Sequence, residues 1–145
     1  MRLLLLAAAL CLAACDRAPP EPRVEVGGAV VQLPAVAGRP GAAYFTLRTN
    51  NDPTRLVSVS SPKVERIELH DMRMDGDVMR MGPATDLTFS DELKFEQGGK
   101  HAMLFGIDPA LKAGDKVTLT FTFDPVPPVT VEAEVRAFGG GHADH

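Results

Sequence analysis

Apolar and polar residues alternate along most of the chain after residue 23. The clearest case is residues 117–123, VTLTFTF, in which every second side chain is Val, Leu or Phe. Neighbouring side chains on a strand point to opposite faces, so a period of two predicts a strand with one buried face. Residues 129–135, VTVEAEV, repeat the pattern. The chain is therefore expected to consist of strands that each contribute one face to a core.

Shorter runs of the same kind predict further strands. They lie at residues 24–26, 29–31, 43–47, 56–60, 64–70, 78–81, 87–89, 93–95 and 101–107. Turn-forming residues separate them, notably at 50–53 and 98–99, and Asp-Gly-Asp at 75–77 is typical of a hairpin turn. We expect residues 109–112 to form one short helical turn. Eight to ten short strands with closely spaced turns predict an all-β sandwich or barrel of Greek-key type.

The first fourteen residues have a different pattern. Arg2 precedes an uncharged, mostly apolar run at 3–14, which is too short to span a bilayer and is typical of an export signal. Residues 12–15, LAAC, resemble the lipobox of bacterial lipoproteins, in which the signal is cut before a Cys that then carries the lipid. An ordinary signal followed by a chance Cys is the alternative. The expected division is a signal peptide at 1–14, a lipidated Cys15 with a Pro-rich tether at 15–22, a folded domain at 23–138 and a flexible tail at 139–145.

Lipid anchoring would leave the mature protein without a free thiol. Cys11 and Cys15 are the chain's two cysteines; the first would be removed and the second acylated, so neither a disulfide nor a thiolate ligand is expected. Asp16 follows the lipid-bearing position and resembles the inner-membrane retention signal of enteric lipoproteins. We therefore expect the domain to be anchored on the periplasmic side of a bacterial inner membrane.

Charge and motif content exclude several classes of function. The net charge is -4, so no basic surplus is present to neutralise phosphates, and nucleic-acid binding is not expected. No dinucleotide-binding or Walker motif occurs. The acidic residues show no paired spacing for hydrolysis, and no nucleophile–base pair stands out, so the chain is not predicted to be an enzyme.

Sulfur and imidazole side chains gather in one segment. Apart from Met1, the methionines are Met72, Met74, Met79, Met81 and Met103, and two of the four histidines, His70 and His101, lie in the same stretch. Thioether sulfur is soft and uncharged and prefers Cu(I), with imidazole as a compatible partner. In His-x-Met, both side chains face the same side of a strand, so three strand segments can converge on one ion. The alternative is that the methionines fill gaps in the core.

The residues around these side chains resemble the periplasmic copper chaperones called PCuAC. The resemblance lies in ELH at 68–70, DVMRM at 77–81 and GGKHAMLFG at 98–106, with weaker similarity at 41–47, 56–62 and 111–115. The family motif is His, ten residues, Met, about twenty-one residues, then His-x-Met; here the two spacings are ten and nineteen. The resemblance implies a cupredoxin-like β-sandwich that delivers Cu(I) toward cytochrome c oxidase assembly.

Carried over position by position, the resemblance implies four copper ligands. These are His70, Met81, His101 and Met103. Met72, Met74 and Met79 match less firmly. Met72 and Met79 are possible auxiliary ligands, with Met72 the preferred candidate for ligand exchange. His142 and His145 in the tail are a candidate Cu(II) site, although a passive tail is an equal alternative. A blue-copper electron carrier needs a Cys thiolate and is not expected.

The functional hypothesis is a lipid-anchored, monomeric Cu(I) chaperone without catalytic activity. Its expected acceptors are a copper-accepting oxidase subunit II or a thiol-bearing assembly factor. Two alternatives stay open: a copper-buffering or resistance protein that needs the same site, and a metal-free structural lipoprotein whose methionines belong to the core.

Overall fold

The computed structural model describes residue 15 and residues 17–139. Within them the chain forms ten strands and no helix. The strands are β1 (Val24–Gln32), β2 (Gly41–Thr49), β3 (Thr54–Ser60), β4 (Val64–Asp75), β5 (Val78–Pro83), β6 (Thr88–Phe89), β7 (Glu92–Phe95), β8 (His101–Ile107), β9 (Lys116–Asp124) and β10 (Val129–Arg136). In these residues there is no helix long and apolar enough to cross a membrane. The predicted signal peptide, His142 and His145 lie outside the described residues.

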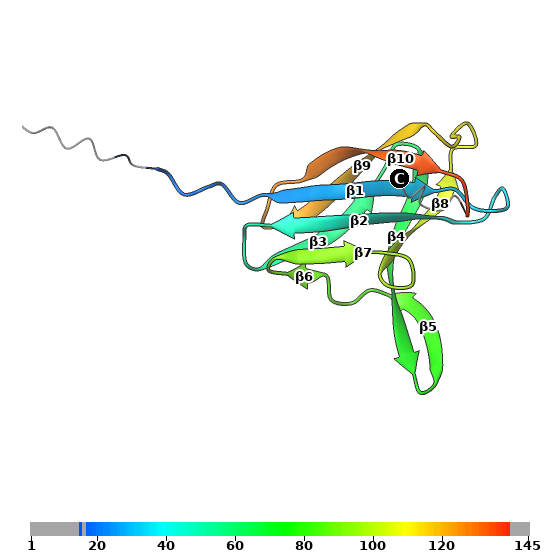
Figure 1. Ribbon diagram of the computed structural model, residues 1–145, viewed down its shortest axis with the longest axis horizontal. Coiled ribbons are helices and arrows are strands. Elements are labelled where there is room, and N and C mark those ends of the chain that lie inside the picture. The colour runs from blue at the N-terminus through cyan, green and yellow to red at the C-terminus, as the bar shows by residue number, and fades with distance from the viewer. Residues whose placement is uncertain (1–14, 16, 140–145) are drawn as a thin grey trace, which may run out of the picture.

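The strands pair in the order β5-β4-β8-β2-β1-β10-β9-β3-β6, and β7 pairs with β2. The β1–β10 pair is parallel and the other pairs are antiparallel. Figure 1 shows β7, β2 and β1 crossing in front of β3, β9 and β4, so the sheet folds over on itself into two layers. The predicted all-β sandwich is confirmed.

Aromatic side chains from opposite layers meet in the core. The rings of Phe45 on β2 and Phe95 on β7 stack with centroids 4.5 Å apart, and Phe121 on β9 meets Phe45 edge-on at 4.8 Å. The alternating residues of β9 predicted to face inward are all buried. No methionine of the described residues belongs to the buried core. The alternative in which the methionines act as core filler is therefore wrong for this segment.

Two local predictions differ from the structure. The runs at 24–26 and 29–31 form a single strand, β1, interrupted by a bulge in which Gly28 has φ +59°. The short helical turn expected at 109–112 is wrong: this segment is a non-helical turn. Asp108 starts a turn, because its main-chain oxygen accepts the N–H of Leu111 at 3.0 Å and its side chain accepts that of Ala110 at 2.9 Å. The turn does not continue as a helix, because the N–H of Lys112 donates to the side chain of Asp115 at 2.9 Å. Such local side-chain bonds compete with helix formation.

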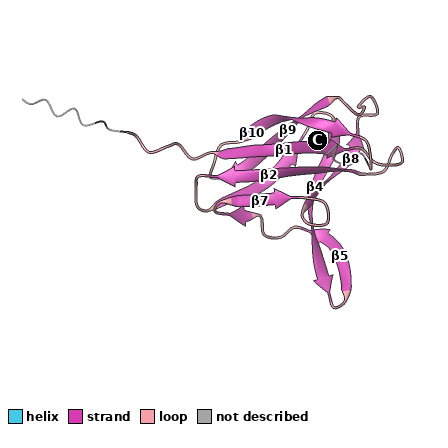
Figure 2. Cartoon of the chain, in the orientation of Figure 1, coloured by secondary structure: helices cyan, strands magenta, loops and turns pink. Residues whose placement is uncertain are grey.

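The β4–β5 hairpin extends beyond the sandwich. The first part of β4, up to His70, pairs with β8, whereas residues 70–75 pair with β5. The outer half of the hairpin projects away from the two layers of the sandwich, as Figures 1 and 2 show. The predicted turn joins the two strands, with Gly76 at φ +62°. Glycine suits this backbone conformation because a Cβ atom is strained there. The hairpin carries four of the five clustered methionines.

Candidate metal centre

The β4–β8 pair has one face in the core and one face outside it. Ala102 and Leu104 of β8 are fully buried, and Leu69 of β4, opposite Ala102, packs against the same core. Side chains alternate between faces along a strand, so His70 and His101 lie on the outer face. These two residues are directly opposite each other in the ladder, and their ring centroids are 5.9 Å apart. Long-range pairing thus brings together two histidines that are distant in sequence.

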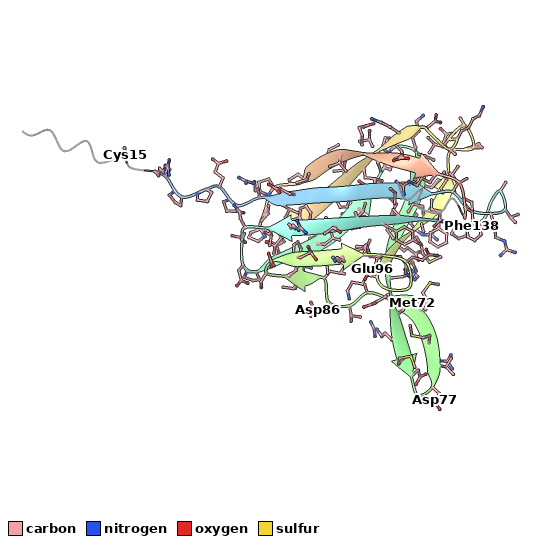
Figure 3. The ribbon with its side chains drawn as sticks, viewed as in Figure 1. Cys15, Met72, Asp77, Asp86, Glu96 and Phe138 are labelled. Atoms are coloured by element: carbon pink, nitrogen blue, oxygen red, sulfur yellow. The ribbon has the colours of Figure 1, made fainter. Side chains whose placement is uncertain are left out.

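Met81 reaches the histidine pair from the other side of β4. Its strand, β5, pairs with β4 so that Met81 lies opposite Met72. The sulfur of Met81 is 3.1 Å from Nε2 of His101, close enough for both atoms to bind the same ion. Met72 follows His70 on the same face, at the base of the hairpin in Figure 3. Four side chains from three neighbouring strands therefore share this region of the surface.

Met103 lies on the same outer face of β8, two residues after His101 and opposite Glu68 in the ladder. It is partly buried and lines a pocket of about 300 Å³ together with Ala42 and Tyr44 of β2. The structure thus places all four predicted ligands on one face. Met79 is farther out along the hairpin, paired with Met74.

Hydrogen bonding orients the ring of His101. Its Nδ1 is 2.9 Å from the main-chain oxygen of Gly99, and a carbonyl oxygen only accepts hydrogen bonds, so Nδ1 carries the proton. In the neutral ring, Nε2 then carries the lone pair, and this atom faces the sulfur of Met81. The ring presents a ligand atom at the place where the sulfur lies. A backbone acceptor behind a ligating histidine is a common way to hold both ring orientation and tautomer.

A second hydrogen bond orients His70 in the opposite tautomer. Its Nε2 lies 3.0 Å from a carboxylate oxygen of Glu68, so Nε2 donates and Nδ1 of the neutral ring carries the lone pair. This Nδ1 is buried and has no hydrogen-bond partner. A buried polar atom without a partner costs free energy unless a ligand satisfies it. An ion bound to Nδ1 would supply that missing partner.

Charged side chains surround the centre without entering it. The hydrogen bond from His70 and the neighbouring Arg66 guanidinium lower the pKa of Glu68 and keep it an acceptor. Burial acts to raise the pKa of Asp71, but the ammonium group of Lys100, 2.9 Å away, acts with the Met72 N–H and the Arg73 charge to hold this pKa below its usual value. No group of three or more His, Cys, Asp or Glu side chains in the described part of the chain is placed to hold a metal ion. The donor set at this surface therefore combines imidazole nitrogen with thioether sulfur.

Sequence reasoning did not identify the two groups that orient the histidines. Glu68 precedes His70 by two residues and so shares its strand face, a signal that the ELH triplet contained. The main-chain oxygen of Gly99 could not be identified in this way, because every residue has such an oxygen and the residue sequence does not mark it. Its role depends on the turn that precedes β8.

The chain matches a protein family model and a curated protein sequence. A family model described as "Putative lipoprotein LpqE-like" matches residues 24–135. Among curated proteins, the uncharacterized protein RP573 of Rickettsia prowazekii is 38% identical over 88 residues, which cover 57% of this chain and 48% of that protein. The chain thus aligns with about half the length of that relative.

Solved structures share the fold over most of the chain. The solution structure of CuI-DR1885 from Deinococcus radiodurans is 29% identical with a TM-score of 0.60, covering 85% of this chain and 83% of that one. The copper-bound PCuAC domain from PmoF2 is 20% identical with a TM-score of 0.61, covering 79% and 92%. The expected cupredoxin-like sandwich is confirmed.

Proposed function

The chain belongs to the LpqE-like family, and from this premise we propose that it binds Cu(I) and carries it to an acceptor protein. His70, Met81, His101 and Met103 are the proposed ligands. The observation that carries the proposal is the buried Nδ1 of His70, which has no partner and lies on the face where Nε2 of His101 meets the Met81 sulfur. The similar Deinococcus radiodurans structure is a copper(I) form, which supports Cu(I) as the bound ion.

The chemistry of the donor atoms favours Cu(I) over harder ions. Two imidazoles and two thioethers are neutral ligands, and thioethers select soft ions, whereas Mg(II) and Ca(II) prefer oxygen. The side chain of Met81 is 50% exposed, so an incoming ligand can approach the ion from solvent. Thiolates are softer and charged, and they would displace a thioether. A thiol-bearing assembly factor or a copper-accepting oxidase subunit is the proposed type of acceptor.

Anchoring at Cys15 is part of the same proposal. Cys15 is exposed and free, and residues 17–23, which precede β1, extend away from the sandwich (Figure 3). A lipid on this residue would hold the domain on the periplasmic side of the inner membrane. The tether would raise the effective concentration of the carrier near membrane-bound acceptors. A periplasmic buffer is the competing candidate, because it needs the same copper site.

Deletion of the gene distinguishes delivery from buffering. If the protein delivers copper, cytochrome c oxidase activity falls in the deletion strain and recovers when copper is added to the medium. Complementation with Cys15→Ser should then give a folded protein in the soluble periplasmic fraction. Copper sensitivity with normal oxidase activity would contradict delivery, and a mature Cys15→Ser protein that stays in the membrane fraction would contradict lipid anchoring.

Replacing Glu68 with alanine is expected to weaken Cu(I) binding about 10- to 100-fold, the usual cost of losing a group that orients a metal-ligating histidine. The variant loses the acceptor that holds Nε2 of His70, so the ring no longer keeps Nδ1 toward the site. Competition with a coloured Cu(I) chelator under anaerobic, reducing conditions measures the change.

Two further variants test whether the effect of Glu68→Ala on Cu(I) affinity comes from the lost hydrogen bond to His70. Glu68→Gln keeps an oxygen that accepts from His70 and should recover much of the affinity. Glu132→Ala removes a remote strand carboxylate that accepts a hydrogen bond from Thr118 and should leave the affinity unchanged. Equal affinities for Glu68→Ala and the parent would show that Glu68 does not position the ligand.

A further inference from the structure

The hairpin holds more sulfur than the proposed copper site uses. In the β4–β5 ladder, Met72 lies opposite Met81, and Met74 lies opposite Met79. Residues directly opposite each other project to the same side, as do residues two apart on one strand. All four methionines therefore occupy one face of the hairpin and extend from the histidine pair toward the turn at Asp77, which Figure 3 shows at the tip.

Packing does not account for these outer methionines. The side chains of Met74 and Met79 are 63% and 52% exposed, and neither contributes to the core. The charged residues of the hairpin alternate with them on the other face, where Arg80 pairs with Asp75 at 2.9 Å. Large apolar side chains gathered on a projecting surface usually mark a binding function.

Three of these thioethers are within reach of a single ion. Met74 and Met79 are direct ladder partners, and such pairs have Cβ atoms about 4.5–5.5 Å apart. Met72 is diagonal to Met79, at a separation of about 7–8 Å that long side chains can bridge. Methionine has an unbranched, flexible side chain, so the three sulfur atoms can turn toward a common point. The fourth methionine, Met81, is already directed at His101.

We propose that Met72, Met74 and Met79 form a second Cu(I) site made of thioethers alone, on the outer half of the β4–β5 hairpin. Thioether sulfur is the ligand that selects Cu(I), and the site contains no charged donor that would favour a harder ion. With fewer ligands and greater exposure than the histidine site, it binds Cu(I) more weakly.

The two sites adjoin, because Met72 of the outer site lies opposite Met81 of the histidine site. An ion can therefore pass between them by exchanging one thioether for its neighbour. The outer site is the entry and exit point of the proposed carrier, and in this role it rests on the proposed function. Its ability to bind Cu(I) stands on the hairpin geometry alone.

Titration of the full chain with Cu(I) tests the outer site. Under anaerobic conditions with a competing coloured chelator, the parent is expected to bind two Cu(I) ions, the second more than tenfold more weakly. Met74→Leu with Met79→Leu removes two sulfurs but keeps apolar side chains of similar size. This variant should bind one ion, with the affinity of the tighter site unchanged. A parent that binds one ion with imidazole coordination, or a variant that still binds two, would overturn the proposal.

Two more variants separate this proposal from the proposed function. Val78→Leu changes an exposed apolar residue at the tip without touching sulfur and should keep both ions. His101→Ala with Met103→Ala should lose the tighter ion and keep the weaker one, with sulfur-only coordination in X-ray absorption. If that variant loses both ions, the outer site is not independent and the inference is wrong. If the parent binds one ion with sulfur-only coordination, the histidine site fails and the outer site stands.

Discussion

Replacing His101 and Met103 together with alanine is expected to lower Cu(I) affinity at the histidine site by roughly a thousandfold or more. Loss of a group that merely orients a ligand costs about 10- to 100-fold, and this variant removes two ligands themselves. It leaves Nδ1 of His70 without its neighbouring imidazole and Met81 without its closest donor atom. Chelator competition under reducing conditions measures the loss.

The control for this variant is a pair of substitutions with the same spacing on a different strand. Thr118→Ala with Thr120→Ala alters two partly exposed residues of β9 and should leave Cu(I) affinity unchanged. Circular dichroism should show the same β-sheet content in both variants, because His101 and Met103 lie outside the buried core. A His101 and Met103 variant that binds Cu(I) as tightly as the parent would refute the site assignment.

Phe121→Ala is expected to lower the free energy of unfolding by about 3–5 kcal/mol, the usual cost of removing a buried aromatic side chain. Phe121 is fully buried on β9, where its ring contacts Phe45 edge-on and lies parallel to Phe123 with centroids 6.4 Å apart. Alanine leaves a cavity between the two layers that these rings now fill. Urea denaturation followed by circular dichroism measures the change.

Val57→Ala is the matched control on the sandwich surface. The side chain of Val57 is 45% exposed, and such substitutions usually change the free energy of unfolding by less than about 0.5 kcal/mol. The denaturant slope should stay the same in both variants if unfolding remains two-state. A Phe121 variant as stable as the control would mean that the two layers repack around the vacancy.

Most of the strand pattern was predictable because the alternation of side chains is a local property. The predicted segment at 101–107 coincides with β8, and the segment at 117–123 falls within β9. Prediction failed where hydrogen bonds competed with local preference. The Asp115 side chain accepts the N–H of Lys112, so the turn at 109–112 does not continue as a helix, and the bulge at Gly28 merged two predicted runs into one strand.

The sequence also determined which atoms are available for metal binding. The His-x-Met spacing places nitrogen and sulfur on one strand face in any register, because the side-chain period of a strand is two. The clustering of methionines near His70 and His101 therefore predicted a soft donor set before any strand was paired. The hairpin turn at 75–77 was equally local and was found where expected.

Only the tertiary structure decided how these donors meet. Strand order places β4 between β5 and β8, so Met81 and His101 approach each other from both sides of His70. Neither this order nor the tautomers set by Glu68 and by the Gly99 oxygen follow from spacing. The strand order depends on pairing between segments far apart in sequence, which the burial of the core selects. The tautomers depend on the geometry of the residues two positions before each histidine, a strand side chain for His70 and the oxygen of a turn for His101. The same pairing extends β4 beyond the sandwich and leaves the outer methionines exposed, because no further strand covers that half of the hairpin in the described structure.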